Sequence, residues 1–461
     1  MATMTTSIPA PTVEAEATAP GAIALRVNGD RLMDSIHSTC EFGKAHAYGG
    51  HHTETGMARL ALNDDDKKVR HWLIEQTKAI GCTVTVDQMG NIFAVRPGKS
   101  KTAAPIMMGS HLDTQPSGGR YDGILGVLAG LEVLRTLHDS GYETEGPVGL
   151  VNWTNEEGAR FPMTTIASGV WAGVIPLETG WNLKEVLPLA TDKSAPRTMK
   201  QELERIGFLG ETPASHEAQP MAAHFELHIE QGPILEDEQR KIGVVTGAQA
   251  YSWFEIEVKG RDSHAGTTPL LARKDSVLAA AKMIVASNEV ATQFSGLATT
   301  GIFEGEPGSI NTVAHTVRFT LDVRHPSDET LAQMIAAIRE KFDKIAKQDS
   351  GRGVDVTWKT LMENAAVAFD KNCIAVVEQS AEEVCGRLSG ESPANGLWKH
   401  MLSGASHDSC QSTKVCPTSM IFTPTRNGMS HTPDEYCSPE DCALGAQVLL
   451  GAVVRYDAAH R

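Results

Sequence analysis

Two apolar runs joined by an apolar helix both lead to side chains that can bind metal, and this pattern constrains the fold most. The first run, 106–109, leads to His111; after a glycine-rich loop, leucine and isoleucine recur at helical spacing over 124–137. The second run, 147–153, leads to the pair Glu156-Glu157. Strand, helix and strand with short connections form a parallel unit, in which ligands bind outside the carboxyl ends of the strands. We therefore expect a site at this edge.

The loop after the first strand can bring an imidazole and a carboxylate together. Gly118 and Gly119 permit the backbone between His111 and Asp122 to fold back, so that both side chains can ligate one metal ion. Asp113 is placed to accept the other imidazole N–H and to fix the tautomer. The alternative is that Asp122 only caps the following helix and that His111 is a surface residue.

The glutamate pair favours the metal interpretation. Two adjacent carboxylates at the end of a buried strand repel each other and resist desolvation unless cations neutralise them. One of Glu156 and Glu157 can bind a metal ion while the other takes a proton from a water molecule. The alternative is a solvated loop that carries two free acids.

Residues 223–233 add another candidate ligand. Apolar and polar residues alternate strictly up to Gly232, which predicts a strand and not the helical His-Glu-x-x-His of many metalloproteases. His228 lies nearest the strand end and is the expected ligand. His224 is expected to be structural or solvent-facing.

A separate module is expected over residues 250–363. Its β-α-β-β-α-β order is that of a split βαβ sandwich. Candidate site residues return after it, at Ser406-His407-Asp408 and Ser430-His431, so we expect the module to be inserted into a catalytic domain formed by 22–249 and 364–461. The expected elements are strand 254–258, helix 275–287, strands 301–303 and 316–323, helix 331–342 and strand 354–358.

Arg324 lies on the polar face of one strand of this module, and its role is open at this stage. It can pair with Asp322 on the same face, which as an exposed ion pair would contribute about 0–1 kcal/mol. If it faces the site, its guanidinium is suited to bind a substrate carboxylate.

The composition argues against several classes of partner. The chain has 41 Lys and Arg against 57 Asp and Glu, a net charge of −16, which disfavours nucleic acid and anionic membranes. No apolar run is expected to reach the roughly 20 residues of a spanning helix. Eight cysteines without a Cys-x-x-Cys pair fit a reducing compartment, and residues 1–21 look like a disordered tail without a targeting signal. We expect a soluble, cytoplasmic protein that acts on a small molecule.

These motifs together resemble a known family. His111-x-Asp113, Asp122, Glu156-Glu157, His228-Ile-Glu-Gln-Gly and Gly-Met-Ser-His431 occur in the order found in the dinuclear-metal amidohydrolases of the N-carbamoyl amino acid hydrolase type. That group includes yeast-type β-ureidopropionase (β-alanine synthase) and allantoate amidohydrolase. The resemblance spans about residues 25–455, and the motifs 155–161 and 263–269 are similar to this branch more than to its peptidase relatives.

The resemblance implies a fold and a metal site. The fold is an α/β, mixed-sheet, di-metal exopeptidase-like catalytic domain with an inserted ferredoxin-like (α+β sandwich) lid and dimerisation domain. One metal ion is implied at His111, Asp122 and His228, and a second at Asp122, Glu157 and His431, so that Asp122 bridges. Zinc is the expected ion, with manganese, cobalt and nickel as alternatives, because His, Asp and Glu accept all of them.

The resemblance also implies roles around the substrate. Glu156 is the general base, His264 and Asn311 stabilise the oxyanion or hold the ureido group, and Arg324 binds the substrate carboxylate. His264 and Asn311 could reach the site from a neighbouring subunit. Gln231 and His407 line the pocket, and Ser406 stands where the family has a glycine.

We therefore predict a homodimeric, two-metal hydrolase. It would cleave the ureido C–N bond of N-carbamoyl-β-alanine, a step of pyrimidine degradation, to the amino acid, CO2 and ammonia. N-carbamoyl-L-α-amino acids and allantoate are the nearer alternatives, and dipeptidase or aminoacylase activity is the more distant one. A metal-binding scaffold without turnover would share all of these ligands.

Overall fold

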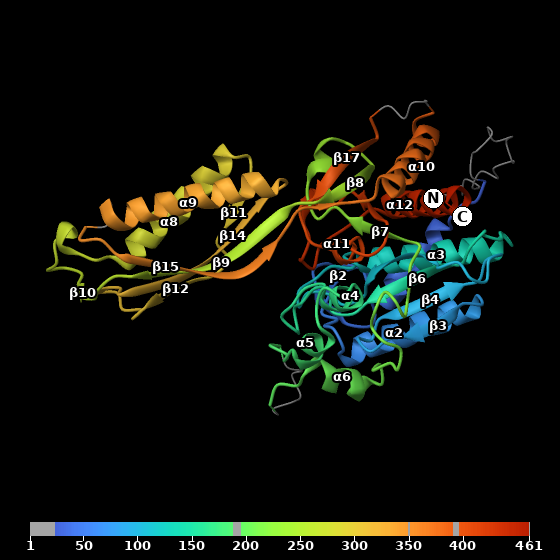
Figure 1. Ribbon diagram of the computed structural model, residues 1–461, viewed down its shortest axis with the longest axis horizontal. Coiled ribbons are helices and arrows are strands. Elements are labelled where there is room, and N and C mark those ends of the chain that lie inside the picture. Colours follow the sequence, from blue (N-terminus) through green and yellow to red (C-terminus); the bar gives the residue numbers. More distant parts are fainter. Residues whose placement is uncertain (1–23, 188–194, 349–350, 391–395, 461) are drawn as a thin grey trace, which may run out of the picture.

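The computed structural model describes residues 24–187, 195–348, 351–390 and 396–460 (Figure 1). The expected tail, 1–21, lies outside the described residues. Two large sheets dominate the described part: one mixed sheet of nine strands and one antiparallel sheet of five. Figure 1 shows the smaller sheet and its two helices extending away from the larger one. The mixed α/β fold predicted from the sequence is confirmed.

The nine-stranded sheet has a parallel centre. Its strands are β3 (Thr83–Val86), β4 (Ile92–Arg96), β5 (Ile106–His111), β6 (Val148–Trp153), β7 (Ala223–Ile229), β8 (Ile242–Ala248), β16 (Val367–Ala368), β17 (Trp398–Ser403) and β18 (Thr418–Thr423). They lie in the order β16-β8-β18-β7-β5-β6-β4-β3, with β17 paired to β8. The neighbours β18, β7, β5 and β6 are mutually parallel, whereas β4, β3 and β16 are antiparallel to their partners.

The predicted strand-helix-strand unit is present as β5, α3 (Ile124–Asp139) and β6. Every residue of β5, β6 and β7 is buried, as expected for parallel strands covered on both faces. In the β5–β6 register His111 lies opposite Trp153, so the loops after both strands leave the same edge of the sheet. This edge carries the candidate site.

Helices cover both faces of this sheet. α3, α10 and α12 pack on one face, and the short helices α4 and α11 pack on the other, where Trp171 joins Phe93, Met107 and Trp153 in a second apolar cluster. A short hairpin pairs β1 (Lys44–Ala47) with β2 (Thr55–Met57). The helices are α1 (Gly29–Thr39), α2 (Asp64–Ala79), α4 (Ile166–Trp171), α5 (Leu177–Asn182), α6 (Met199–Ile206), α7 (Ile234–Asp237), α10 (Lys371–Ser389), α11 (Ser409–Ser412) and α12 (Pro439–Ala459), with a 3-10 turn η2 (Arg426–Gly428).

Helix α12 departs from one expectation. Among the described residues it is the one helix long and apolar enough to cross a membrane by length and composition, so the expectation that no such segment exists is wrong on that criterion. Its apolar stretch is 67% buried, and the helix packs against α3, α10 and the sheet. The apolar composition of α12 is therefore used in the core of this fold.

The second sheet belongs to the module expected between the two halves of the catalytic domain. Its elements are β9 (Ala250–Lys259), β10 (Ser263–His264), η1 (Leu270–Ala272), α8 (Ser276–Gln293), β11 (Leu297–Thr299), β12 (Phe303–Glu306), β13 (Thr312–Val313), β14 (Thr316–His325), α9 (Asp328–Gln348) and β15 (Asp355–Asn364). The sheet order is β11-β14-β9-β15, with β12 also on β14 and with α8 and α9 packed on one face over a separate apolar core. The strand expected at 301–303 is observed as two short strands, β11 and β12.

Candidate metal centre and active site

The carboxyl ends of the parallel strands bring five of the predicted residues into one cluster. The ligand atoms of His111, Asp122 and His228 all lie within 4.8 Å of one another, and so do those of Asp122, Glu157 and His431. Asp122 belongs to both groups. Its Oδ1 lies 3.1 Å from Nε2 of His228 and 3.6 Å from Nε2 of His111, whereas its Oδ2 lies 3.3 Å from Nε2 of His431. The two oxygens of one carboxylate therefore face two different ligand groups.

Local backbone geometry makes this cluster possible. Gly123 begins α3 with φ +66°, and a Cβ at this position would lie 2.3 Å from Cε1 of His111. Only glycine lets the helix start approach the imidazole so closely. After β6, Asn155 adopts a left-handed φ of 57°, and its side-chain amide donates to the carbonyls of Phe161 and Met163. This sharp turn directs Glu156 and Glu157 back over the end of the sheet.

Backbone carbonyls hold the imidazoles of His111 and His228. Nδ1 of His111 donates to the carbonyl oxygen of Asp113 at 2.9 Å, and Nδ1 of His228 donates to that of Ile229 at 2.8 Å. Each imidazole therefore presents Nε2 to the cluster, and Nε2 of His111 is buried without a hydrogen-bond partner. An orphaned, buried imidazole nitrogen beside carboxylates fits a metal ligand.

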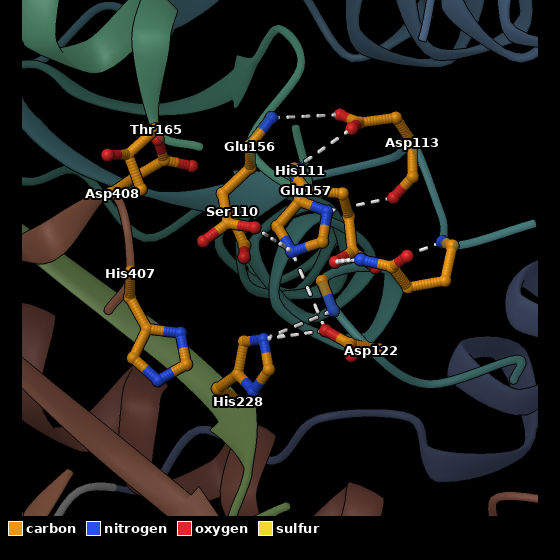
Figure 2. Close-up of polar contacts among 12 residues, drawn as sticks. Ser110, His111, Asp113, Asp122, Glu156, Glu157, Thr165, His228, His407 and Asp408 are labelled. Atoms are coloured by element: carbon orange, nitrogen blue, oxygen red, sulfur yellow. Dashed lines mark hydrogen bonds and ion pairs between the residues drawn. The ribbon is translucent and has the colours of Figure 1, made fainter. Parts of the chain in front are cut away.

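The expected role of Asp113 needs a correction. Its carbonyl, and not its carboxylate, accepts the imidazole N–H of His111. The carboxylate instead accepts the backbone N–H groups of Glu156 and Glu157, each at 3.3 Å, because the turn after β6 passes directly above it (Figure 2). Asp113 therefore fixes both strand-end loops relative to each other.

The electrostatics of the cluster favour bound cations. Burial raises the pKa of Glu156 well above its usual range and that of Glu157 to about 7, with Asp122 as the next contribution for Glu157. Burial lowers the pKa of His111, but the carboxylates, Glu156 first, outweigh it and raise the pKa well above the usual value. Among the described residues, histidines supply all the ion-pair partners of these three carboxylates. Divalent ions would supply the positive charge that this set of donors lacks.

A cavity of about 210 Å³ adjoins the cluster, and other predicted site residues line it as well. Glu156, with its Oε2 3.5 Å from Nε2 of His111, faces this cavity together with Gln231, Arg324 and His407. The Nε2 amide of Gln231 donates to Oδ2 of Asp122 at 2.8 Å. His407 is buried, and burial, followed by the nearby His228, lowers its pKa to about 3, so it is neutral.

Arg324 is paired with Asp322 and also lies at the cavity. Its Nε and Nη2 donate to the carboxylate of Asp322, at 2.7 to 3.1 Å, and its Nη1 donates to the carbonyl of Gly404 at 2.8 Å. The guanidinium nevertheless lines the cavity. The pairing with Asp322 therefore holds the guanidinium in place at the cavity wall.

Two predicted residues lie away from this site. His264 is in β10, which pairs with β13 at the end of the module far from the nine-stranded sheet (Figure 1). Asn311 is its neighbour, since the N–H of Ala265 donates to the carbonyl of Asn311 at 2.9 Å. Both side chains are exposed, and neither lines the cavity. Within one chain, the structure does not bring them to the metal ligands.

Two other residues that support the cluster were not found from the sequence. Glu435 is buried, and its Oε1 accepts the backbone N–H groups of Tyr121 and Asp122 while its Oε2 accepts the hydroxyl of Ser430. Gln115 donates to both oxygens of Glu157. The position of Glu435 four residues after His431 was the available signal.

A third possible ligand set does not fit a metal. Glu226, His228 and His407 also lie close together. However, Glu226 is fully buried and does not line the cavity, and its oxygens accept from Ser110 and Ser409. On the same strand, His224 is fully buried against Ser409 and Ser412. Of the two predictions for this histidine, the structural role is confirmed and the solvent-facing position is wrong.

A mixed sheet that gathers histidines and carboxylates at the ends of its parallel strands is the arrangement of a metal-dependent hydrolase. Residues 107–455 match the family model described as Peptidase family M20/M25/M40, and the chain belongs to this family.

Similar proteins narrow the class to amidohydrolases. The chain is 39% identical to an N-carbamoyl-L-amino-acid amidohydrolase of Rhizobium meliloti, over 93% of this chain and 96% of that protein. It is 32% identical to a ureidoglycolate hydrolase of Oryza sativa subsp. japonica, over 94% of this chain and 86% of that protein. A solved amidase of the hydantoinase/carbamoylase family from Burkholderia multivorans matches with a TM-score of 0.83 and 42% identity, covering 94% and 98% of the two chains. The resemblance inferred from the sequence motifs is confirmed, and the protein is an amidohydrolase.

Proposed function

We propose that this protein hydrolyses the ureido group of N-carbamoyl-L-α-amino acids with the help of two divalent metal ions, zinc first. The observation that carries the proposal is the position of Asp122, whose two oxygens face two separate groups of ligands. One ion would be held by His111, Asp122 and His228, and the other by Asp122, Glu157 and His431.

Two bound ions would lower the pKa of a water molecule and polarise the ureido carbonyl. Glu156 takes the proton of the attacking water and returns it to the departing nitrogen. Its burial and its place on the cavity wall, beside His111, support this role. The neighbouring Glu157 lies with Asp122 and His431 in a ligand group, so it suits a ligand better than a base.

Arg324 binds the substrate carboxylate. Its hydrogen bonds to Asp322 and Gly404 use Nε–H and one N–H on each terminal nitrogen, which leaves one N–H on each Nη for a ligand. Since Asp322 already orders the guanidinium, little further side-chain entropy is lost when a carboxylate binds. Gln231 and His407 complete the walls of the same cavity.

The α-amino acid substrate is favoured over N-carbamoyl-β-alanine, the first expectation from the sequence. Several relatives are named N-carbamoyl-L-amino-acid amidohydrolases, and others are named ureidoglycolate hydrolases. In both kinds of substrate the ureido nitrogen and the carboxylate are attached to one carbon. N-carbamoyl-β-alanine has an additional methylene between them, so a site of fixed span from metal ions to Arg324 should separate the two classes.

We further propose that residues 250–363 act as a lid and dimerisation domain between the catalytic parts 22–249 and 364–461. Exposed apolar side chains on α8 and near β12 and β13, including Val285, Ile302 and Ile310, support a homodimer through this module. In such a dimer His264 and Asn311 of one subunit would reach the cavity of the other and stabilise the oxyanion.

All eight cysteines are unpaired and buried, which supports a cytoplasmic location.

A substrate screen tests this function. Ammonia release would be measured on the metal-loaded protein with N-carbamoyl-L-alanine, N-carbamoyl-β-alanine, ureidoglycolate and allantoate, and release of free alanine would be measured with the dipeptide L-alanyl-L-alanine. N-carbamoyl-D-alanine is the matched stereochemical control. We expect the highest kcat/KM with the L-α substrate. Faster turnover of the β-alanine derivative would refute the choice of an L-α substrate. No turnover of any ureido compound would refute the proposed activity and favour the alternative of a metal-binding scaffold without turnover.

A further inference from the structure

A further buried carboxyl group, Asp408, lies near Glu156 (Figure 2). It is 0% exposed and does not line the cavity. It precedes helix α11, but its side chain forms no capping hydrogen bond to that helix. The usual role of an aspartate at this position is therefore absent, and the group needs another explanation.

The hydrogen bonds of Ser168 indicate the protonation state of Asp408. Oγ of Ser168, in α4, lies 3.0 Å from the carbonyl oxygen of Thr165 and 2.5 Å from Oδ1 of Asp408. A serine hydroxyl has one proton, so it cannot donate to both oxygens. Both contacts are satisfied if Ser168 donates to Thr165 and accepts a proton carried by Oδ1 of Asp408.

The surroundings of Asp408 agree with a neutral acid. Its Oδ2 is buried without a hydrogen-bond partner, a costly position for one end of an ionised carboxylate. Burial, followed by Glu226, raises the pKa of Asp408 well above its usual range. The two contacts of Ser168 and the unpartnered Oδ2 therefore assign a proton to Asp408.

The same hydrogen bonds connect Asp408 to the backbone of Glu156. The N–H of Thr165 donates to the carbonyl of Glu156 at 2.8 Å. Thr165 has a left-handed φ of 49°, which is strained for a β-branched residue. Two contacts hold this turn in place: Gln411, one turn after Asp408, donates to Oγ1 of Thr165 at 3.0 Å, and Ser168 binds Asp408.

We propose that Asp408 is a positioning residue for Glu156: a neutral carboxylic acid that donates to Ser168, holds the Thr165 turn, and occupies the space beside Glu156 without adding a negative charge. The inference rests on the proposed function, because it assigns Glu156 as the base. The acid of Asp408 transfers no proton to substrate and acts only through the place and charge of Glu156.

The test compares two substitutions of Asp408. In Asp408→Asn the amide N–H can donate to Ser168 in place of the acid proton, so we expect kcat, KM and metal content close to those of the wild type. Asp408→Ala removes the contact, and we expect kcat to fall about 10- to 100-fold while KM and metal content are unchanged, as for a misplaced catalytic group. Ser412→Ala is the matched control, since this buried serine of α11 contacts His224 and Thr418 and should leave kcat unchanged.

Two results would overturn the inference. Equal loss of kcat in Asp408→Asn and Asp408→Ala, with metal still bound, would mean that the ionised carboxylate is required. Wild-type kcat in Asp408→Ala would mean that Asp408 does not position Glu156. If Asp408→Ala does not fold, Ser168→Ala takes its place: lower kcat at constant KM supports the inference, and wild-type kcat overturns it. An inactive wild type would instead refute the proposed function.

Discussion

Replacing Asp122 with Asn should empty both metal positions at once. The carboxylate turns Oδ1 toward His111 and His228 and Oδ2 toward His431, and it is the one residue shared by the two ligand groups. Asparagine has the same shape, but its N–H₂ group is no ligand and its neutral amide oxygen is a weaker ligand than a carboxylate oxygen, so both ligand groups lose affinity. By contrast, His228→Ala and His431→Ala each remove a ligand from one group only.

The size of the effect follows from this geometry. Removing an outer-shell partner alone costs about 10- to 100-fold in metal affinity, so losing a direct ligand should cost at least about 100-fold, or about 2.7 kcal/mol per ion. At a free metal concentration of about ten times the wild-type Kd, two sites hold about 1.8 ions in the wild type. One weakened site leaves about 1.0 ion, and two weakened sites leave about 0.2.

Equilibrium dialysis at fixed free metal, followed by elemental analysis, would measure these ratios. Asp434→Asn is the matched control: it removes one negative charge beside His431, but its carboxylate binds Thr432 and no ligand group. We expect this variant to retain the wild-type ratio. An Asp122→Asn protein that keeps two ions, or loses only one, would refute the bridging role.

Four further perturbations test other parts of the site. Glu156→Gln should lower kcat by about 10²- to 10⁴-fold with metal content unchanged, and normal ammonia release would exclude Glu156 as the base. Arg324→Ala should raise KM by about 10- to 100-fold, because charge-assisted hydrogen bonds of about 1.5–3 kcal/mol are lost; unchanged kinetics would leave Arg324 only its pairing with Asp322. A random 1:1 mixture of His264→Ala and Glu156→Gln subunits should recover about a quarter of wild-type activity if His264 acts across the dimer, because about half of the dimers are mixed and each has one intact site; it should recover none if His264 acts within its own subunit. The buried His224 has its pKa lowered to about 4 by desolvation, whereas unfolded histidine titrates near 6.5, so the unfolded chain gains this proton first as the pH falls. The contribution of His224 to the free energy of unfolding should be complete above pH 6.5 and fall by on the order of 3 kcal/mol toward pH 4. In denaturant unfolding, the free energy of unfolding of His224→Gln should fall less steeply with pH than that of the wild type, and an identical pH profile would contradict this.

Much of the catalytic sheet could be predicted because its signals are local. The apolar runs before His111 and Glu156, and the helical spacing between them, predict β5, α3 and β6, and the observed register places both strand ends at one edge. The strict alternation around His228 predicts β7 in the same way. Helix α12 was missed as a long apolar segment, because its charged residues interrupt the run in sequence while its packing against α3 and α10 buries the apolar face.

Other features of the site could not be found in this way because they depend on distances across the fold. The choice between the carboxylate and the carbonyl of Asp113 as partner of His111 depends on where the turn after β6 passes. The sequence left open whether Arg324 pairs with Asp322 or faces the site, and only the fold shows that it does both. The position of Glu435 four residues after His431 marks it as a candidate, but no pattern in the sequence indicates that it binds the N–H of Asp122, 313 positions away.

The sequence by itself determined the order of the elements, the set of histidines and carboxylates, and the family, because periodicity and motif spacing are properties of short segments. Only the tertiary structure decided which oxygen of Asp122 faces which imidazole, that Asp408 contacts Ser168, and that His264 and Asn311 lie far from the metal ligands of their own chain. These relations join residues that are distant in the chain, and packing fixes them only after strands and helices have met. The chemistry was thus readable from residue types, and its geometry only from the fold.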